Sequence, residues 1–390
     1  MDKNSLPKHW QIKTLGEVCI NSSSNLAAKD VKDKNGKFPV FGASGIIGYI
    51  DEFQKEKQSI GVVKDGAGIG RIFLLPPNSS IISTLHYLEA TQEIEILYLY
   101  YLLSSLNLSK YGSGSAIPHI YFKDYKKEII YLPSIAEQRE IVSEIERRFE
   151  KLDKAIENFR QILKNLKLYR QSVLKFAFDG KFTNPNLTNW QTKPLGEICE
   201  ITRGGKFQKK DFQDNGIPCI HYGQIYTKYN FIVENTINFV SNEVAEKNKK
   251  FAKKDDIVMT ITSENIQDVC KSIVYLGNQD CAISGHTAII KHKQFAKFLN
   301  YFFYSPIFFN QKIKFARGQK VIEISPLKLQ EIQIPLPPLS EQKQIVNEIE
   351  KRFAKADKIE NLINKSLKNA EILKQSILKQ AFSGNLKVKK

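Results

Sequence analysis

Two glycine-rich stretches in the first third of the chain have the composition of loops that bind phosphate. They read G-A-S-G-I-I-G at residues 42–48 and G-A-G-I-G-R at residues 66–71. Neither is a Walker loop, because no G-K-[ST] follows, and the second lacks the last glycine of G-x-G-x-x-G. Two interpretations remain open: plain hairpin turns, or tight turns at which Ser44, Lys64 and Arg71 approach DNA phosphates.

Basic residues cluster around two loops in the second half of the chain. Arg203, Lys206 and Lys209 surround a Gly-Gly pair, and R-G-Q-K at residues 317–320 supplies Arg317, Gln319 and Lys320. Arg pairs bidentately with guanine and Gln with adenine, while Lys binds phosphate. The alternative is a solvated charged loop. The equivalent place in the first half holds Y-G-S-G-S-A-I-P-H at residues 111–119, and from it Ser113 and His119 are candidate DNA contacts.

No catalytic motif is evident. Paired carboxylates, Ser-His-Asp spacing and H-E-x-x-H are missing, as are D-P-P-Y, N-P-P-Y and a glycine motif for S-adenosylmethionine. We interpret His86, His221 and His286 as structural. The five cysteines form no C-x-x-C pair, and Cys19 and Cys199 match as small buried residues. The sequence therefore predicts no catalytic residue, no metal site and no cofactor in this chain.

Composition points to a polyanionic partner. The 390 residues carry a formal charge of +17 with a pI near 9.4, which favours nucleic acid. A content of 42% hydrophobic and 11% aromatic residues excludes a disordered chain. There is no apolar signal core and no run of about 18 apolar residues, so we expect a cytoplasmic protein without a membrane span.

A sequence repeat predicts the elements that position these residues. Residues 132–180 begin with L-P-S-I-A-E-Q-R-E-I-V, and 204 positions later residues 336–384 repeat the pattern, with Glu137 matching Glu341 and Gln138 matching Gln342. Each copy reads as one long helix. Ser134 with Glu137 forms a capping-box pattern, and Gly180 and Gly384 stand where left-handed C-caps belong.

Apolar residues three and four apart give each helix the seam of a coiled coil. The predicted core of the helix pair is Val142, Ile145, Phe149, Leu152, Ile156, Leu163, Val346, Ile349, Phe353, Ile363, Leu367 and Ile377. The second seam is weakened at Glu360 and Lys374. An antiparallel pair with Val142 opposite Ile377 would place Phe149 against Ala370 and Leu163 against Ala356. A register shifted by one heptad is the alternative.

A second repeat opens each half of the chain. W-Q-I-K-T-L-G-E-V-C at residues 10–19 returns as W-Q-T-K-P-L-G-E-I-C at residues 190–199. We therefore predict a globular module at 1–133, a spacer helix at 134–183, a second module at 184–337 and a distal helix at 338–390. Between these anchors the modules hardly match, and F-P-V-F-G-A-S-G-I-I-G at residues 38–48 has no evident counterpart.

Short strands dominate both predicted modules. The expected strand regions are residues 38–50, 59–75, 217–225, 256–262 and 271–276. One amphipathic helix in each module, near residues 94–106 and 295–313, should pack on the sheet. The fold class is α+β, with two mixed α/β modules, a pair of long antiparallel coiled-coil helices and a pseudo-twofold internal repeat.

These motifs resemble those of a known family. L-P-x-x-x-E-Q-x-x-I-V at the start of each helix, Q-S-[VI]-L-K-x-A-F-x-G at its end, and W-x-x-x-x-L-G-E before each module are similar to the specificity subunit of type I restriction-modification systems. So is F-P-V-F-G-A-S-G-I-I-G-Y at residues 38–49. The resemblance covers the whole chain and departs from the family only at the weakened seam.

The resemblance implies a function. Each module would be a target-recognition domain that reads one half of a split double-stranded DNA sequence, and the helices would hold the two domains a fixed distance apart. Two modification subunits that bind S-adenosylmethionine and methylate adenine would dock near the helices, joined by restriction subunits that use ATP and magnesium. The specificity subunit itself would catalyse nothing.

Two other classes of function compete with this one. The chain could be a DNA methyltransferase or nuclease acting by itself, with motifs that we do not recognise. It could also be a basic coiled-coil protein that binds partners and reads no sequence. Activity of the purified chain alone distinguishes the first, and loss of all sequence preference at raised salt distinguishes the second.

Overall fold

The computed structural model of the chain describes residues 7–114, 117–183 and 190–387. It divides into two compact units. Unit 1 consists of Met1–Arg160 with Asn364–Lys390, and unit 2 of Gln161–Ile363. Each unit therefore contains one globular module and a part of both long helices.

The two predicted long helices are present as α4 (Ile135–Phe178) and α11 (Leu339–Phe382), each of 44 residues. At about 1.5 Å per residue each is about 66 Å long. Both end as expected, at Gly180 with φ 72° and Gly384 with φ 73°. The next amide bonds back across the last turn, from Lys181 to the Phe176 carbonyl at 3.0 Å and from Asn385 to the Gln380 carbonyl at 2.9 Å, as in a Schellman motif.

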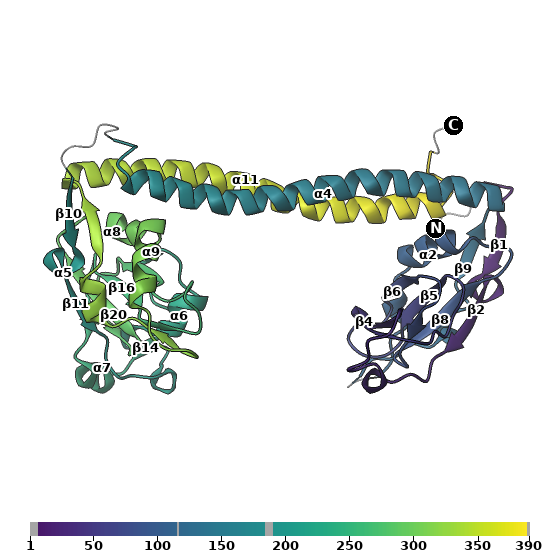
Figure 1. Cartoon of the computed structure of the whole chain (residues 1–390), viewed down its shortest axis with the longest axis horizontal. Coiled ribbons are helices and arrows are strands. Elements are labelled where there is room, and N and C mark those ends of the chain that lie inside the picture. Colours follow the sequence, from purple (N-terminus) through teal and green to yellow (C-terminus); the bar gives the residue numbers. More distant parts are fainter. Residues whose placement is uncertain (1–6, 115–116, 184–189, 388–390) are drawn as a thin grey trace. The chain divides into compact units, whose positions relative to one another are not determined.

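Within each unit the helix segments run antiparallel (Figure 1). In unit 1 Asp153 of α4 pairs with Lys374 of α11. In unit 2 Arg170 of α4 pairs with Asp357 and with Glu360, the latter at 2.8 Å. The polar residues that weaken the seam are thus joined in ion pairs, at equivalent positions in the two units.

The expected register is wrong by about one heptad. With Val142 opposite Ile377, Lys374 would lie opposite Ile145, about 12 Å along the helix from Asp153. Instead the Lys374 ammonium pairs with Asp153 and lies 5.0 Å from the centre of the Phe149 ring. Seven-residue periodicity repeats every heptad, so apolar spacing alone does not select between these registers.

All twelve predicted core side chains of the helix pair are shielded from solvent to some degree. Val142, Ile145, Ile377, Val346, Ile349 and Ile363 are buried. The other six, Phe149, Leu152, Ile156, Leu163, Phe353 and Leu367, are half-buried.

The E-Q pair at the start of each helix binds the adjoining module. The Trp10 indole donates to Glu137 Oε1 at 3.0 Å, and the Trp190 indole donates to Glu341 Oε1 at 3.1 Å. In unit 1 the Glu137 carboxylate therefore binds a module side chain, in addition to the 3.4 Å bond from its amide to the Ser134 hydroxyl. The repeated tryptophan and glutamate motifs are explained by this contact.

The glutamine of each pair is buried and bonds mainly to backbone. Gln138 accepts from the Glu95 amide at 2.8 Å and donates to the carbonyls of Glu93 and Pro133 at 3.0 Å. Gln342 likewise accepts from the Phe295 amide at 3.0 Å and donates to the Pro337 carbonyl and the Gln294 side chain at 2.9 Å. Because a buried amide group needs its partners, both glutamines fix the module against the helix.

Each module begins with a strand that pairs with the strand before the long helix. The pairs are antiparallel: β1 (Gln11–Thr14) with β9 (Ile129–Leu132), and β10 (Gln191–Pro194) with β22 (Gln333–Leu336). The L-G-E motifs then form single-turn helices, α1 (Leu15–Val18) and α5 (Leu195–Ile198). Cys19 and Cys199 follow these helices and are buried, as expected.

Besides the β1–β9 pair, the unit 1 module contains two sheets, with α2 (Ile96–Ser105) packed on the larger one (Figure 1). The larger sheet has the order β2 (Cys19–Ser23), β8 (Leu85–Ala90), β5 (Ser59–Val63), β6 (Ile72–Leu75). The smaller sheet has the order β4 (Gly45–Ile50), β3 (Phe38–Gly42), β7 (Ser80–Ile81). The short α3 (Phe122–Tyr125) precedes β9.

The unit 2 module repeats this plan with additions. Its larger sheet has the order β11 (Cys199–Arg203), β20 (Thr287–His292), β16 (Ile257–Thr260), β18 (Ser272–Tyr275), β13 (Ile232–Val233). Its smaller sheet has the order β14 (Phe239–Val240), β12 (Ile217–Ile220), β19 (Cys281–Ile283), β15 (Phe251–Ala252). Its helices are α6 (Tyr222–Thr227), α7 (Asn242–Asn248), α8 (Ala296–Phe303), α9 (Pro306–Phe315) and α10 (Pro326–Gln330).

The modules match in topology where their sequences do not. Strand β3 pairs antiparallel with β4 and parallel with β7. Strand β12 pairs in the same way with β14 and β19. The segment at residues 38–48, which has no counterpart in sequence, therefore has one in structure. Backbone pairing, which does not depend on side-chain identity, carries this likeness.

Two expected elements differ from the structure. Residues 222–227 form α6 rather than a strand, because the His221 side chain caps the helix by accepting from the Gly223 amide at 3.1 Å. The single helix expected at residues 295–313 is two helices, α8 and α9. Ser305 caps α9 by accepting from the Phe308 amide, and Pro306 fixes its first turn.

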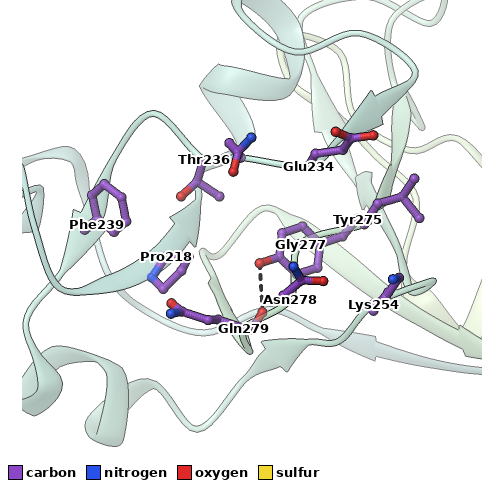
Figure 2. Close-up of a pocket in the computed structure, with 11 residues that line it drawn as sticks. Pro218, Glu234, Thr236, Phe239, Lys254, Tyr275, Gly277, Asn278 and Gln279 are labelled. Atoms are coloured by element: carbon purple, nitrogen blue, oxygen red, sulfur yellow. Dashed lines mark hydrogen bonds between the residues drawn. The ribbon is translucent and has the colours of Figure 1, made fainter.

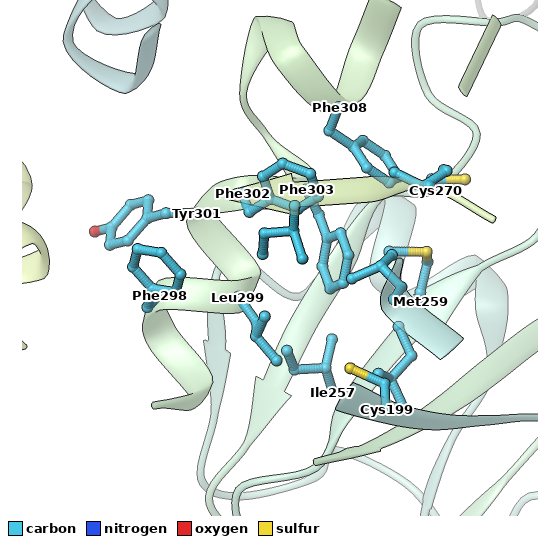
Figure 3. Packing of buried hydrophobic residues seen from close by; sticks show 14 of the residues in the cluster. Cys199, Ile257, Met259, Cys270, Phe298, Leu299, Tyr301, Phe302, Phe303 and Phe308 are labelled. Atoms are coloured by element: carbon cyan, nitrogen blue, oxygen red, sulfur yellow. The ribbon is translucent and has the colours of Figure 1, made fainter. Parts of the chain in front are cut away.

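The unit 2 core joins the module to both helix segments. Phe298, Phe302 and Phe308 from α8 and α9 pack with Met259 and Cys199 of the sheet (Figure 3). Phe178 of α4 lies 5.1 Å from Phe298 between ring centres. In unit 1 Tyr98 of α2 meets Phe382 of α11 in the same way, also at 5.1 Å. Each module is thus anchored on the end of one helix and the start of the other.

His86 in β8 should make the stability of unit 1 depend on pH. It is 3% exposed and bonds to the Tyr125 hydroxyl, and burial lowers the pKa of His86 to about 4. The unfolded chain takes up a proton below pH 6.5 and the folded chain only near pH 4, so stability falls as pH falls between these values. We expect a loss of about 2 kcal/mol between pH 7 and pH 5.

Urea unfolding followed by Trp10 fluorescence in a Trp190→Phe background measures this loss. His86→Gln should be less stable at pH 7 and should lose the pH-dependent part. An identical pH dependence in variant and parent would contradict the assignment.

Candidate nucleic-acid interface

In unit 1 the predicted DNA-contacting residues lie on loops that are bonded to one another. The Gly66 amide donates to the Pro118 carbonyl and the Ile120 amide to the Lys64 carbonyl, both at 2.9 Å. His119 Nδ1 lies 2.7 Å from Asp65 Oδ1. Loop 64–71 and loop 111–119 therefore form one surface. Ser115 and Ala116 lie outside the described residues.

Arg71 connects this surface to the first glycine-rich turn. Its guanidinium donates to the Ala43 carbonyl at 3.4 Å, beside Ser44. Ser44, Arg71 and Ser113 are exposed, while Lys64 and His119 are half-buried. The structure thus brings together all five candidates of unit 1. Neither glycine-rich stretch forms a loop at the start of a long helix, so the two remain turns rather than nucleotide cradles.

In unit 2 Arg203 and Arg317 both contact Glu323, Arg203 through its side chain and Arg317 through its backbone. Arg203 pairs with the Glu323 carboxylate at 3.1 Å. Glu323 and Arg317 exchange two backbone hydrogen bonds of 2.8 and 3.0 Å, which close the loop that carries Gln319 and Lys320. Strand β21 (Ile322–Glu323) also pairs with β17 (Thr262–Ser263). Arg317, Gln319 and Lys320 are exposed, and within the described residues none of the three contacts an acidic side chain through its own side chain.

Lys206 and Lys209 line a cavity of about 650 Å³ beside this loop. Its wall is completed by His221, Tyr222 and His286, and the Lys206 amide is held by the Asn248 side chain at 2.9 Å. A neighbouring cavity of about 460 Å³ shares Tyr222 and His286 and reaches Val321. The loops that carry the six candidates of unit 2 therefore meet at these two cavities, and we call the surface that they form the basic surface, although Glu264 and Asp268 also line the second cavity.

His221 and His286 have different roles. Burial, with the nearby charges of Lys209 and His286, lowers the pKa of His221 to about 4, so its neutral ring accepts the α6 cap bond. This agrees with a structural histidine. His286, by contrast, is exposed in a turn with φ 65° and lies 5.2 Å from the Tyr222 ring.

Sequence reasoning missed the aromatic lining of these cavities. Tyr222 and Tyr226 from α6 flank the opening, and Lys271 donates to the Tyr226 carbonyl at 3.2 Å. Interleaved tyrosines and lysines suit nucleic acid, because aromatic rings contact bases and ammonium groups contact phosphates. The mixture I-H-Y-G-Q-I-Y at residues 220–226 carried this signal, but we read it as a strand.

The two candidate loops are built alike. Ser113 and His119 exchange backbone hydrogen bonds of 2.9 and 2.8 Å, as Arg317 and Glu323 do. The two pairs are 204 positions apart in the sequence, which is the same offset that relates the two long helices. The glycine after the first residue has positive φ in both, 97° at Gly114 and 103° at Gly318. The predicted equivalence of the two loops is therefore visible in their backbone.

A further cavity of about 650 Å³ lies at the other end of the unit 2 strands (Figure 2). Pro218 and Tyr275 line it with Asn278 and Gln279, and the Tyr275 hydroxyl donates to the Gln279 carbonyl at 2.8 Å. Pro218 lies near the start of β12, whereas His221 follows its end. No predicted site residue lines this cavity, so it is separate from the basic surface.

The part of the chain that the structure describes shows neither a metal site nor a membrane-spanning helix. No group of three or more His, Cys, Asp or Glu side chains there could hold a metal ion. No helix there is both long and apolar enough to cross a bilayer.

Comparison with known proteins identifies the class to which this architecture belongs. The family model described as type I restriction modification DNA specificity domain matches residues 7–168 and 188–369. Since these ranges cover most of the chain, the protein belongs to the type I restriction-modification DNA specificity family. It is a specificity subunit, as the sequence resemblance indicated.

Relatives of full length support this assignment. The EcoDI specificity subunit of Escherichia coli is 25% identical over 412 residues, which cover 99% of this chain and 90% of the relative. The MjaVIII specificity subunit of Methanocaldococcus jannaschii is 24% identical, over 98% of this chain and 94% of the relative.

Solved structures share the fold. A chain from a structure of a type I R-M system aligns with a TM-score of 0.73 at 20% identity, covering 98% of this chain and 99% of that one. The HsdS subunit from Thermoanaerobacter tengcongensis gives a TM-score of 0.57 at 20% identity, with 98% of both chains covered. The predicted fold class, two mixed α/β modules with long antiparallel helices and an internal repeat, is confirmed.

Proposed function

We propose that this subunit reads a two-part DNA target, one half-site with each module. The observation that carries the proposal is the equivalence of the two loops, 113–119 and 317–323. Among the described residues, each loop is exposed at its first residues and at Ile117 or Val321, lies beside basic side chains and is closed by the same backbone bonds. The residues within the loops differ, S-G-S-A-I-P-H against R-G-Q-K-V-I-E, as they should if each module reads its own sequence.

The long helices have two roles in this proposal. Their fixed length sets the spacing between the half-sites, and their outer faces bind two modification subunits, which supply S-adenosylmethionine chemistry. Support for a docking face comes from apolar side chains that remain exposed on the helices, such as Tyr169 and Phe176 in unit 2 and Ile372 and Leu373 in unit 1. Restriction subunits would then join the complex of the specificity and modification subunits.

The chain itself is assigned no catalytic step. Its candidate residues are hydrogen-bond donors and cations that suit phosphates and base edges, and all act by binding. Such a subunit would work in the cytoplasm, where the cell's DNA lies. The proposed domain limits remain 1–133 and 184–337 for the readers and 134–183 and 338–390 for the helices.

Purified subunit, with and without modification subunits, tests the proposal. Mapping methylated adenines in DNA treated with the assembled complex should give a single two-part sequence. The subunit should prefer a duplex with that sequence at salt concentrations that abolish binding to a scrambled duplex. Methylation or cleavage by the subunit alone would show instead that it is an enzyme.

Arg317→Ala and Lys206→Ala should weaken binding in different ways. If Arg317 reads a base edge, its loss should cost about ten- to hundredfold in affinity for the target and relax preference at one position. If Lys206 contacts a phosphate, its loss should weaken binding to all sequences alike. It should also reduce the slope of log affinity against log salt concentration by about one. Lys247→Ala, on the exposed face of α7, is the matched control. Unchanged affinity in both variants would show that neither of these two loops belongs to the interface.

A further inference from the structure

Each of the two candidate loops exposes one β-branched apolar side chain. Ile117 is 58% exposed in unit 1 and Val321 is 57% exposed in unit 2. A single exposed apolar residue is common on protein surfaces and indicates nothing by itself. Here the same kind of residue recurs at the same place in two modules, 204 positions apart.

The backbone holds these two residues in the same way. A Cβ on Gly114 would lie 2.7 Å from the Ile117 carbonyl oxygen, and one on Gly318 would lie 2.0 Å from the Val321 carbonyl oxygen. Both turns therefore require glycine, because the carbonyl oxygen of the apolar residue lies where a Cβ would be. The five other positions of the loops carry different residue types. Glycine and the β-branched residue are what the loops have in common.

The surroundings of these side chains are those of a polar binding surface. Val321 borders the cavity of Tyr222 and His286 and adjoins the exposed Lys320 and Gln319. Ile117 lies two residues from His119, which contacts Asp65. A β-branched side chain has few rotamers, so it presents a fixed apolar surface at little cost in entropy.

We propose that Ile117 and Val321 each contact the 5-methyl group of a thymine in the half-site read by their own module. In the major groove that methyl group is the one apolar feature of a base edge, and apolar side chains recognise it. This inference rests on the proposed DNA-reading function and adds a specificity-determining residue to each module. It also predicts at least one A·T pair in each half-site.

Replacement of thymine by deoxyuridine tests the contact, because uracil lacks only that methyl group. The probe is a duplex with the sequence obtained by methylation mapping, and each thymine is replaced in turn. For the unchanged subunit, one replacement in the unit 2 half-site should reduce affinity about fourfold, the value of about one buried methyl group. Val321→Ser should lower affinity for the thymine duplex by a similar factor and remove the response to that replacement.

Controls separate this contact from other roles of the loop. Val321→Ile, which keeps the apolar surface, should retain the response to deoxyuridine. Ile117→Ser should abolish a response in the other half-site only. If no thymine responds, if the responses survive Val321→Ser and Ile117→Ser, or if a half-site lacks A·T pairs, the contact does not exist. Loss of all sequence preference in the unchanged subunit would instead overturn the DNA-reading function.

Discussion

Exchange of residues 1–133 for the corresponding module of another specificity subunit should change one half of the recognised sequence and leave the other half intact. Each mismatched base pair costs about 1–3 kcal/mol, so a half-site of several base pairs should change preference by about three orders of magnitude or more. The physical reason is that unit 1 forms its own core with its own helix segments. Methylation mapping of the exchanged subunit measures the outcome.

The reciprocal exchange of residues 184–337 is the control for this experiment. It should change only the opposite half-site, because the unit 2 module packs on the other helix segments. An exchange that altered both half-sites, or neither, would show that the modules do not read independently. Folding of each hybrid is checked by whether the unexchanged half-site is still recognised.

Gln342→Leu should have the largest effect on stability. The change leaves the Phe295 amide, the Pro337 carbonyl and the Gln294 side chain without their partner in a region where Gln342 is 1% exposed. Unsatisfied buried polar groups cost about 1–3 kcal/mol each, so unit 2 should lose about 3 kcal/mol or more. Trp190 fluorescence in a Trp10→Phe background follows the unfolding.

Gln344→Leu is the matched control, since Gln344 is an exposed glutamine on the same helix. It should change stability by less than about 0.5 kcal/mol. Gln138→Leu should destabilise unit 1 as Gln342→Leu destabilises unit 2. If Gln342→Leu and Gln344→Leu were equally mild, the buried glutamine would not anchor the module.

The sequence predicted the features that depend on local signals. The helix ends follow from Gly180 and Gly384, and the equivalence of the two loops follows from the repeat. The antiparallel pairing was expected from the match of large with small seam residues and from the family resemblance. Prediction from the sequence failed where tertiary contacts determine the structure. The register depends on the ion pairs of Lys374 and Arg170, which an apolar pattern does not contain. The break between α8 and α9 was signalled by Ser305 and Pro306, and we overlooked it.

The candidate site was predicted in parts and assembled by the structure. Each unit gathers its predicted residues on one surface, because hydrogen bonds such as Gly66 to Pro118 join distant loops. The tyrosines of α6 and the common topology of β3 and β12 were not predicted. Strand pairing is a relation between backbones, and two strands can share it without sharing any side chain. The identity of the base contacts stays a prediction.

The attachment of each module to its helix has an evolutionary consequence. Gln138 and Gln342 bind chiefly main-chain amide and carbonyl groups, which every polypeptide offers. A gene segment encoding an unrelated reader can therefore be inserted by recombination without compensating mutations in the helix, provided that the incoming segment keeps its flanking tryptophan. New restriction specificities would arise in one genetic event rather than by gradual adjustment.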